Sequence, residues 1–208
     1  MCGARTTQSS GGLQTASTDW QLGLPELAGE RVTLRELRTS DAGAMYDALR
    51  DPEVRPFMWA PPPSASAFEQ FIAWSHSERA AGMYICYGIV PRGESHALGV
   101  FELRRHQPGF VRGELGFVMA PRLWGGGLFT EGAGLVLDFA FNVVGCHRIE
   151  ARAAIDNNRG NAVLRKLGAH REGRLRAAFL RDEKYVDQYL WSILDTDWVA
   201  RRVQPSER

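Results

Sequence analysis

The chain has 208 residues, of which 44% are hydrophobic, so it can bury one substantial core without needing two domains. Its 25 basic and 24 acidic residues leave a formal net charge of +1, which argues against a strongly electrostatic partner such as bulk nucleic acid. No apolar run is long enough to span a membrane, and the first residues lack the apolar segment of a signal peptide. We therefore expect a cytoplasmic protein with no membrane and no nucleic-acid partner.

Three cysteines, Cys2, Cys86 and Cys146, are widely spaced along the chain. Their spacing matches neither a metal-binding pattern nor a disulfide framework, and their odd number fits a reducing compartment. We expect no metal.

The first 22 residues are rich in Ser, Thr, Gly and Gln and carry few large apolar side chains. Such a segment cannot bury enough surface to offset the entropy of ordering it. The sequence therefore predicts a disordered tail over residues 1–24, a single domain over 25–200 and a short C-terminal tail over 201–208.

The domain begins with an alternating apolar pattern over residues 31–37, which predicts a strand. Two helices are predicted next, over 42–49 and 67–81, each with a polar capping residue before it. Between them lies a proline-rich loop with three large apolar side chains, Phe57, Met58 and Trp59. Such side chains either touch a ligand or fix a loop to the core, and we favour the second role.

The second half of the domain alternates between strands and helices. Strands are predicted over 83–90, 96–104, 110–119, 148–155, 171–180 and 185–194, and helices from about 128 to 144 and over 157–168. The resulting order, β-α-α-β-β-β-α-β-α-β-β, predicts a mixed α/β sheet.

A glycine-rich turn, Arg122-Leu-Trp-Gly-Gly-Gly127, joins the predicted strand over 110–119 to the following helix. Its unobstructed N–H groups and the positive end of the helix dipole suit a phosphate. A nucleoside-triphosphate loop would need Lys and Ser or Thr where Leu128 and Phe129 stand, and a dinucleotide motif would need Gly in place of Thr130. On the loop alone, a plain glycine-rich turn remains an equal alternative.

Several motifs occur together in the order typical of one family. They are Asp51-Pro-Glu-Val54 with Trp59, Gly116-Phe117, Pro121, Trp124-Gly-Gly-Gly127, Thr130-Glu131, Asn157, Lys166-Leu-Gly168, and Asp187 with Leu190-Trp-Ser192. Together they resemble the GCN5-related N-acetyltransferases (GNAT), and within them the RimJ/RimL subgroup that acts on the N-termini of ribosomal proteins. The resemblance covers about residues 28–198. It implies the GNAT fold, a mixed, mostly antiparallel sheet of about seven strands flanked by about four helices.

The resemblance also implies a binding site for acetyl-CoA as co-substrate. The residues expected to hold it are Phe117, Val118 and Met119 along the pantetheine arm, Arg122, Gly125, Gly126, Gly127, Leu128 and Thr130 around the pyrophosphate, and Asn157.

The catalytic groups are less complete. Family members often carry a tyrosine or a serine as the acid, but Leu164 and Gly160 occupy those two positions. Asn161 and Tyr189 are polar replacements that the sequence does not rank. Glu114 is the first candidate for the base and Glu150 the second, because a direct transfer needs a neutral amine.

The resemblance favours transfer of an acetyl group to the N-terminal α-amine of a protein or peptide. Two alternatives stay open: acetylation of a small amine such as an aminoglycoside-like drug, and a non-catalytic regulator that binds CoA. We expect a monomer or a homodimer.

Overall fold

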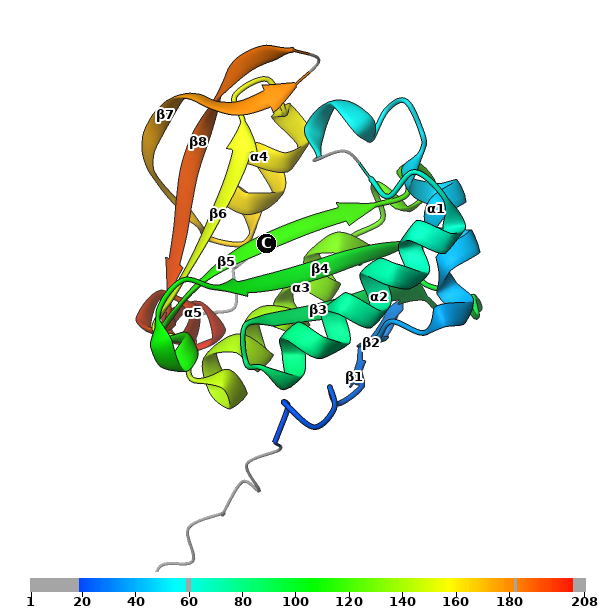
Figure 1. The fold of residues 1–208 in the computed structure, drawn as a ribbon. Coiled ribbons are helices and arrows are strands. Elements are labelled where there is room, and N and C mark those ends of the chain that lie inside the picture. The colour runs from blue at the N-terminus through cyan, green and yellow to red at the C-terminus, as the bar shows by residue number, and fades with distance from the viewer. Residues whose placement is uncertain (1–18, 59–60, 182, 204–208) are drawn as a thin grey trace, which may run out of the picture.

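The computed structural model describes residues 19–58, 61–181 and 183–203. These residues build one eight-stranded sheet in the order β1-β2-β3-β4-β5-β6-β8-β7 (Figure 1). Its strands are β1 (Leu27–Ala28), β2 (Val32–Glu36), β3 (Tyr84–Pro91), β4 (Gly99–Arg105), β5 (Arg112–Met119), β6 (Arg148–Ala154), β7 (His170–Arg181) and β8 (Lys184–Leu194). Neighbouring strands are antiparallel except β5 and β6. The predicted mixed, mostly antiparallel sheet is confirmed.

The helices are α1 (Ala42–Leu49), α2 (Ala65–Ala80), α3 (Leu128–Phe139), α4 (Asn158–Lys166) and α5 (Asp195–Val203). A π-helical turn, Ala140–Val144, extends α3. Two elements were not predicted, the short strand β1 and the helix α5. The helix α5 starts directly after β8, with Asp195 and Asp197 in its first turn, where carboxylates oppose the positive end of the dipole.

Part of the predicted N-terminal tail packs on the domain. The indole of Trp20 meets the ring of Phe110 edge to face, with 5.8 Å between the centroids. The guanidinium of Arg79 donates a hydrogen bond to the carbonyl of Gln21. Residues 19–24 therefore do not behave as the tail that their composition predicted, because one aromatic side chain is enough to attach them. Residues 1–18, 204–208 and Trp59 lie outside the described residues.

Each face of the sheet has its own core (Figure 1). Helix α3 packs on one face through Val136, Leu137 and Phe139, where α4 joins the same core. Helices α1 and α2 cover the other face, where Met45 and Ile72 are buried. The side chains of a strand alternate between the two faces, so the sequence of β3 is apolar throughout its length.

The strands β5 and β6 pair over only three positions, from Arg112 with Arg148 to Glu114 with Glu150. Figure 1 shows the two strands starting side by side and then separating. On its other edge β5 remains paired with β4 as far as Met119. The sheet therefore splits along one seam, and this split positions the candidate site.

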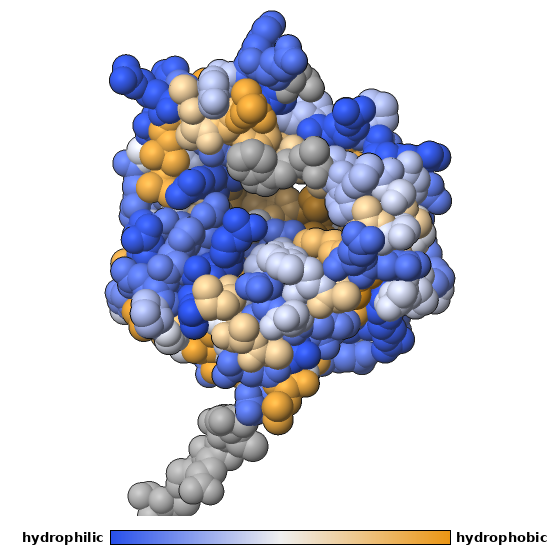
Figure 2. Space-filling model, in the orientation of Figure 1, coloured by the Kyte–Doolittle hydropathy of each residue, from blue (hydrophilic) through white to orange (hydrophobic). Residues whose placement is uncertain are grey.

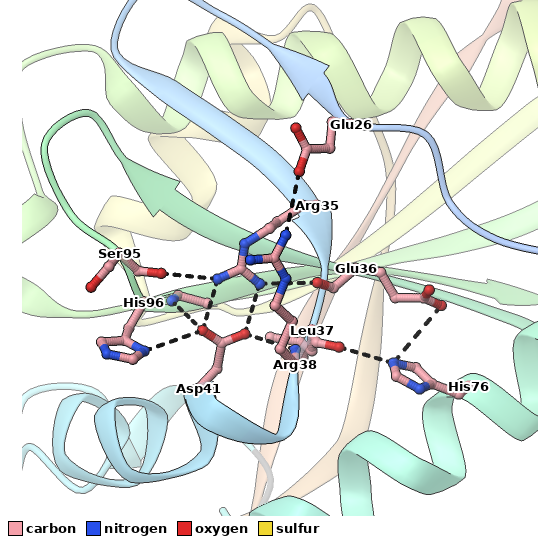
Figure 3. Close-up of polar contacts among 10 residues, drawn as sticks. Glu26, Arg35, Glu36, Leu37, Arg38, Asp41, His76, Ser95 and His96 are labelled. Carbon is pink, nitrogen blue, oxygen red and sulfur yellow. Dashed lines mark hydrogen bonds and ion pairs between the residues drawn. The ribbon is translucent and has the colours of Figure 1, made fainter.

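A buried ion pair fixes the start of α1 to the sheet (Figure 3). The Asp41 carboxylate, which is 0% exposed, accepts two hydrogen bonds from the guanidinium of Arg35 at 2.8 and 2.9 Å. It also accepts from the backbone N–H groups of Arg38 at 2.8 Å and Ala97 at 3.0 Å. The cluster thus ties together β2, α1 and the turn between β3 and β4.

Candidate functional site

A cavity of about 750 Å³ lies where β5 and β6 separate. Its walls come from both faces of the sheet, with Val54 and Phe57 from the segment after α1, and Phe129 and Val163 from α3 and α4. Figure 2 shows the hollow near the centre of the molecule, with apolar residues inside it. A cavity of this size, mostly apolar with a few polar groups, is typical of a small-molecule site.

A glycine cradle forms one end of this cavity. Gly125, Gly126 and Gly127 line it, and all three have positive φ angles of 85°, 54° and 83°. Residues with side chains rarely adopt this backbone conformation, so the glycines are needed for the shape of the loop. Gly127 is also the N-cap of α3, and as a glycine it has no side chain to accept from the first-turn N–H groups. These donors are therefore available to an anion.

Two cations not singled out by the sequence lie close to the cradle. Arg31, from the segment before β2, donates a hydrogen bond to the carbonyl of Gly126. Arg159, in the first turn of α4, lies 3.7 Å from the ring centroid of Trp124, and both residues line the cavity. Arg122, the predicted phosphate partner, points elsewhere: it is largely exposed, does not line the cavity and pairs with Glu94 at 2.9 Å. The turn after Pro121 directs its side chain toward the β3–β4 turn.

This end of the cavity fits a pyrophosphate. It offers the first-turn N–H groups of α3 at the positive end of the helix dipole and the guanidinium of Arg159 in the cavity wall, with Arg31 bonded to the cradle from outside the wall. Thr130, another predicted contact, lines the cavity too. Leu128 lies in the first turn of α3 but does not line the cavity.

The open edge of β5 forms a second wall. Phe117, Val118 and Met119 line the cavity beyond the last β5–β6 pair. Within the described part of the chain, no strand pairs with their backbone groups on this edge, so an amide-bearing chain can add to the sheet there. Their contact with a pantetheine arm stays a prediction.

Asn157 lies where β6 gives way to α4. Its side-chain oxygen accepts a hydrogen bond from the N–H of Gly160 at 2.8 Å, and the residue lines the cavity. It is therefore both a helix cap and a wall residue. A Cβ on Gly160 would lie 2.6 Å from the Asn157 side chain, so this contact uses the space that a serine would need.

Asn161 and Leu164 belong to the interior. Asn161 is 6% exposed and donates to the carbonyls of Ala154 and Asn157, both at 2.9 Å. Its oxygen accepts from the indole N–H of Trp191 at 3.0 Å. Leu164 is buried in the core, and neither residue lines the cavity. Because its amide is fully used, we assign Asn161 a structural role and no longer a catalytic one.

Asn161→Ala is expected to lower the free energy of unfolding by about 3 kcal/mol, because it leaves the buried Trp191 N–H without a partner and removes the side-chain hydrogen bonds to the carbonyls of Ala154 and Asn157. Urea denaturation measures the loss. Asn158→Ala is the matched control, since Asn158 is exposed on the same helix, and it should change stability by less than about 0.5 kcal/mol. Equal stability of the two variants would contradict the structural role of Asn161.

Tyr189 lies on β8 beside the cavity but does not line it. Its ring packs against the α3 core and under the guanidinium of Arg171, at 4.6 Å. The adjacent residue, Gln188, lines the cavity instead. Successive side chains of a strand point to opposite faces, so Gln188 faces the cavity and Tyr189 faces the α3 core.

The two predicted carboxylates are held by cations. Glu114, at the last β5–β6 pair, accepts from His106 at 2.8 Å and lies 3.8 Å from Arg152. Glu150 is buried between Arg112 and Arg148. Burial alone would raise the pKa of Glu150, but the two arginines outweigh it and leave that pKa below its ordinary value. Neither carboxylate lines the cavity.

Glu102, on β4, is a carboxylate that the sequence analysis did not consider. It lies opposite Gly116 of β5, and its Oε2 is 3.1 Å from where a Cβ of Gly116 would be. Gly116 lines the cavity, and Glu102 lies directly behind it without lining the cavity itself. The only signal in the sequence is a charged residue between the buried Phe101 and Leu103, which places Glu102 on the face covered by α1 and α2.

Arg181 joins three segments at the rim of the cavity. It pairs with Asp156 at 2.7 Å, donates to the carbonyl of Pro56 at 3.4 Å and lies over the ring of Phe57. The hydrogen bond from Arg181 holds the pKa of Asp156 below its ordinary value. Asp156 and Phe57 both line the cavity, so this contact connects the β7–β8 hairpin to the segment after α1.

The split sheet and its glycine cradle define an acetyltransferase fold. The model of the acetyltransferase (GNAT) domain family matches residues 31–170. The chain belongs to this family and is an acetyl-CoA-dependent N-acetyltransferase, as its sequence predicted.

Known relatives cover most of the chain. The uncharacterized N-acetyltransferase p20 of Bacillus licheniformis is 26% identical over 172 residues, which are 82% of this chain and 97% of that protein. The ribosomal-protein-S5-alanine acetyltransferase of Vibrio fischeri has a similar structure, with a TM-score of 0.76, 18% identity and coverage of 84% of this chain and 98% of that one. RimJ of Mycobacterium smegmatis, solved with CoA-disulfide, also has a similar structure. Its TM-score is 0.73 and its identity 24%, with coverage of 82% of this chain and 89% of that one.

The described residues contain no group of three or more His, Cys, Asp or Glu side chains placed to hold a metal ion. Cys86 and Cys146 are free and buried. Among the described helices, none combines the length and the apolar character needed to cross a bilayer.

Proposed function

We propose that this enzyme acetylates the N-terminal α-amine of a protein or peptide. The observation that carries the proposal is the mixed charge of the cavity wall. Two acidic side chains, Glu53 and Asp156, and three basic ones, Arg152, Arg159 and Lys166, line it. Asp156 is already paired with Arg181.

The same wall disfavours an aminoglycoside-like drug. A site for a polycation needs several free carboxylates near its opening. Asp51, Glu53, Glu69 and Glu114 are the acidic residues that could attract a polycation, and of these four Glu53 alone lines the cavity within the described residues. A single α-ammonium group followed by an uncharged peptide is a better match to one carboxylate among apolar neighbours.

The chemistry of the acceptor favours an α-amine over a lysine side chain. An α-amine has a pKa of about 7.8, against about 10.4 for lysine, so deprotonating lysine costs roughly 3.5 kcal/mol more. A site that offers its amine few carboxylates gains most from the acceptor that loses its proton easily.

The structural neighbours support the same choice. One is the ribosomal-protein-S5-alanine acetyltransferase, and another is a RimJ. They are fold relatives, and their activities agree with the subgroup that the sequence resembles.

The residues of this chain would divide the work between the two ends of the cavity. The cradle at Gly125–Gly127 and the cations Arg31 and Arg159 would hold the pyrophosphate of acetyl-CoA. The open edge of β5 would align the pantetheine arm, and a backbone N–H near Val118 would stabilise the negative charge that develops on the carbonyl oxygen. The apolar rim around Phe57 would exclude water from the amine.

Two peptides of one sequence test the acceptor, one with its N-terminus blocked and one with its lysines blocked. After incubation with acetyl-CoA, mass spectrometry should find the acetyl group on the lysine-blocked peptide. Labelling of the N-blocked peptide alone would contradict the proposal. Labelling of neither, with turnover on a panel of small amines, would identify a small-molecule acceptor instead.

A further inference from the structure

The strand β4 places the carboxylate of Glu102 beside the open part of β5. Glu102 pairs directly with Gly116, and the missing side chain there leaves its Oε2 against a residue of the cavity wall. We propose that Glu102 is the catalytic base, which takes the proton of the acceptor amine directly or through one water.

The position of the split separates Glu102 from Glu114. Glu114 occupies the last paired position of β5 and β6, so it lies where the seam is still closed. Gly116 is two residues further along, where the strands have separated and the cavity begins. Glu114 is also held by His106 and faces Arg152, contacts that favour its role in joining strands.

The surroundings of Glu102 suit a base. Burial raises the pKa of its carboxyl above the ordinary value, although a hydrogen bond from the Tyr84 hydroxyl and the charge of Arg104 act in the opposite direction. Cys86 is the other titratable group nearby, and burial keeps it a neutral thiol by raising its pKa. A carboxylate with a raised pKa is better matched to a proton transfer near neutral pH than an ordinary glutamate.

The protons of the reaction balance with a single base. An ammonium loses two protons when it becomes an amide. One goes to Glu102 and from there to solvent. The other ends on the sulfur of CoA, which keeps the electron pair of the broken carbon–sulfur bond as the new carbon–nitrogen bond forms.

The role of Glu102 rests on the acetyl transfer itself and not on the identity of the acceptor, so any amine that gives turnover serves in the test. Glu102→Gln keeps the shape and can still accept from Tyr84. We expect it to lower kcat at least 100-fold, with unchanged stabilisation by acetyl-CoA in a thermal melt. Glu114→Gln is expected to lose less than about tenfold. The reverse order of the two losses would overturn the proposal.

Two further measurements do not depend on the folding of Glu102→Gln. Tyr84→Phe removes a hydrogen bond that lowers the pKa of Glu102, so the acidic limb of the pH–rate profile should move to higher pH. Carbon-13 NMR of the free wild-type protein, assigned with a conservative variant, should find one glutamate titrating above the ordinary range and shifting in Tyr84→Phe. The assignment would be refuted if the acidic limb of the pH–rate profile did not move in Tyr84→Phe, or if Glu102 titrated like a free glutamate.

Discussion

Gly127→Val is expected to abolish acetyl-CoA binding while the protein stays folded. Gly127 has a φ of 83°, a conformation in which a β-branched residue is strongly strained. An added Cβ would also lie 2.8 Å from the guanidinium of Arg31. The loop must therefore change shape, and the N–H groups of the cradle lose their alignment. Helix α3 should persist, because its buried residues Val136 and Leu137 hold it to the sheet.

Calorimetric titration measures this loss, which we expect to exceed 100-fold in Kd. At a hundredfold excess over the wild-type Kd, acetyl-CoA should stabilise the wild type by about 2.7 kcal/mol and the variant by almost nothing. Gly134→Ala is the matched control, since Gly134 lies inside α3 with no atom within 4 Å of an added Cβ. It should bind normally and be slightly more stable. A folded Gly127→Val protein with normal affinity would rule out the cradle as the binding site.

Asp41→Ala is expected to cost about 3–5 kcal/mol of stability, because it leaves the guanidinium of Arg35 buried without its partner. Asp41→Ala should also remove the part of the pH dependence of the free energy of unfolding that comes from the Asp41 carboxyl group. Burial alone would raise the pKa of Asp41, but the hydrogen bonds from Arg35, Arg38 and Ala97 outweigh it and leave the pKa lowered. In the wild type this contribution is complete above the unfolded pKa of about 3.9 and disappears as the pH falls through the lower folded value.

Urea denaturation from pH 7 to pH 2 tests this expectation. The wild type should lose stability more steeply than Asp41→Ala below about pH 4, so the difference between the two should shrink. Asp47→Ala serves as the control, because the carboxylate of Asp47 is exposed on α1 and makes only a surface ion pair with Arg50. A constant difference between wild type and Asp41→Ala across this range would contradict the proposed linkage.

The sequence predicts the parts of this structure that depend on neighbouring residues. Alternation identified the long strands, and the glycines at 125–127 identified the cradle, because both signals are local. The sequence did not predict the contacts that join distant segments. Arg31 reaches Gly126 across 95 positions, and Glu102 meets Gly116 only through the pairing of two strands. Gln188, and not the predicted Tyr189, lines the cavity, because the partners of β8 decide which face each of its side chains takes.

The cavity crosses the sheet, because its walls come from the faces covered by α1 and by α3. We expect the two reactants to approach each other from opposite sides of the sheet, so that neither has to leave before the other arrives. Steady-state kinetics should then follow a sequential scheme with intersecting double-reciprocal lines. A parallel, ping-pong pattern would require the protein to carry the acetyl group itself.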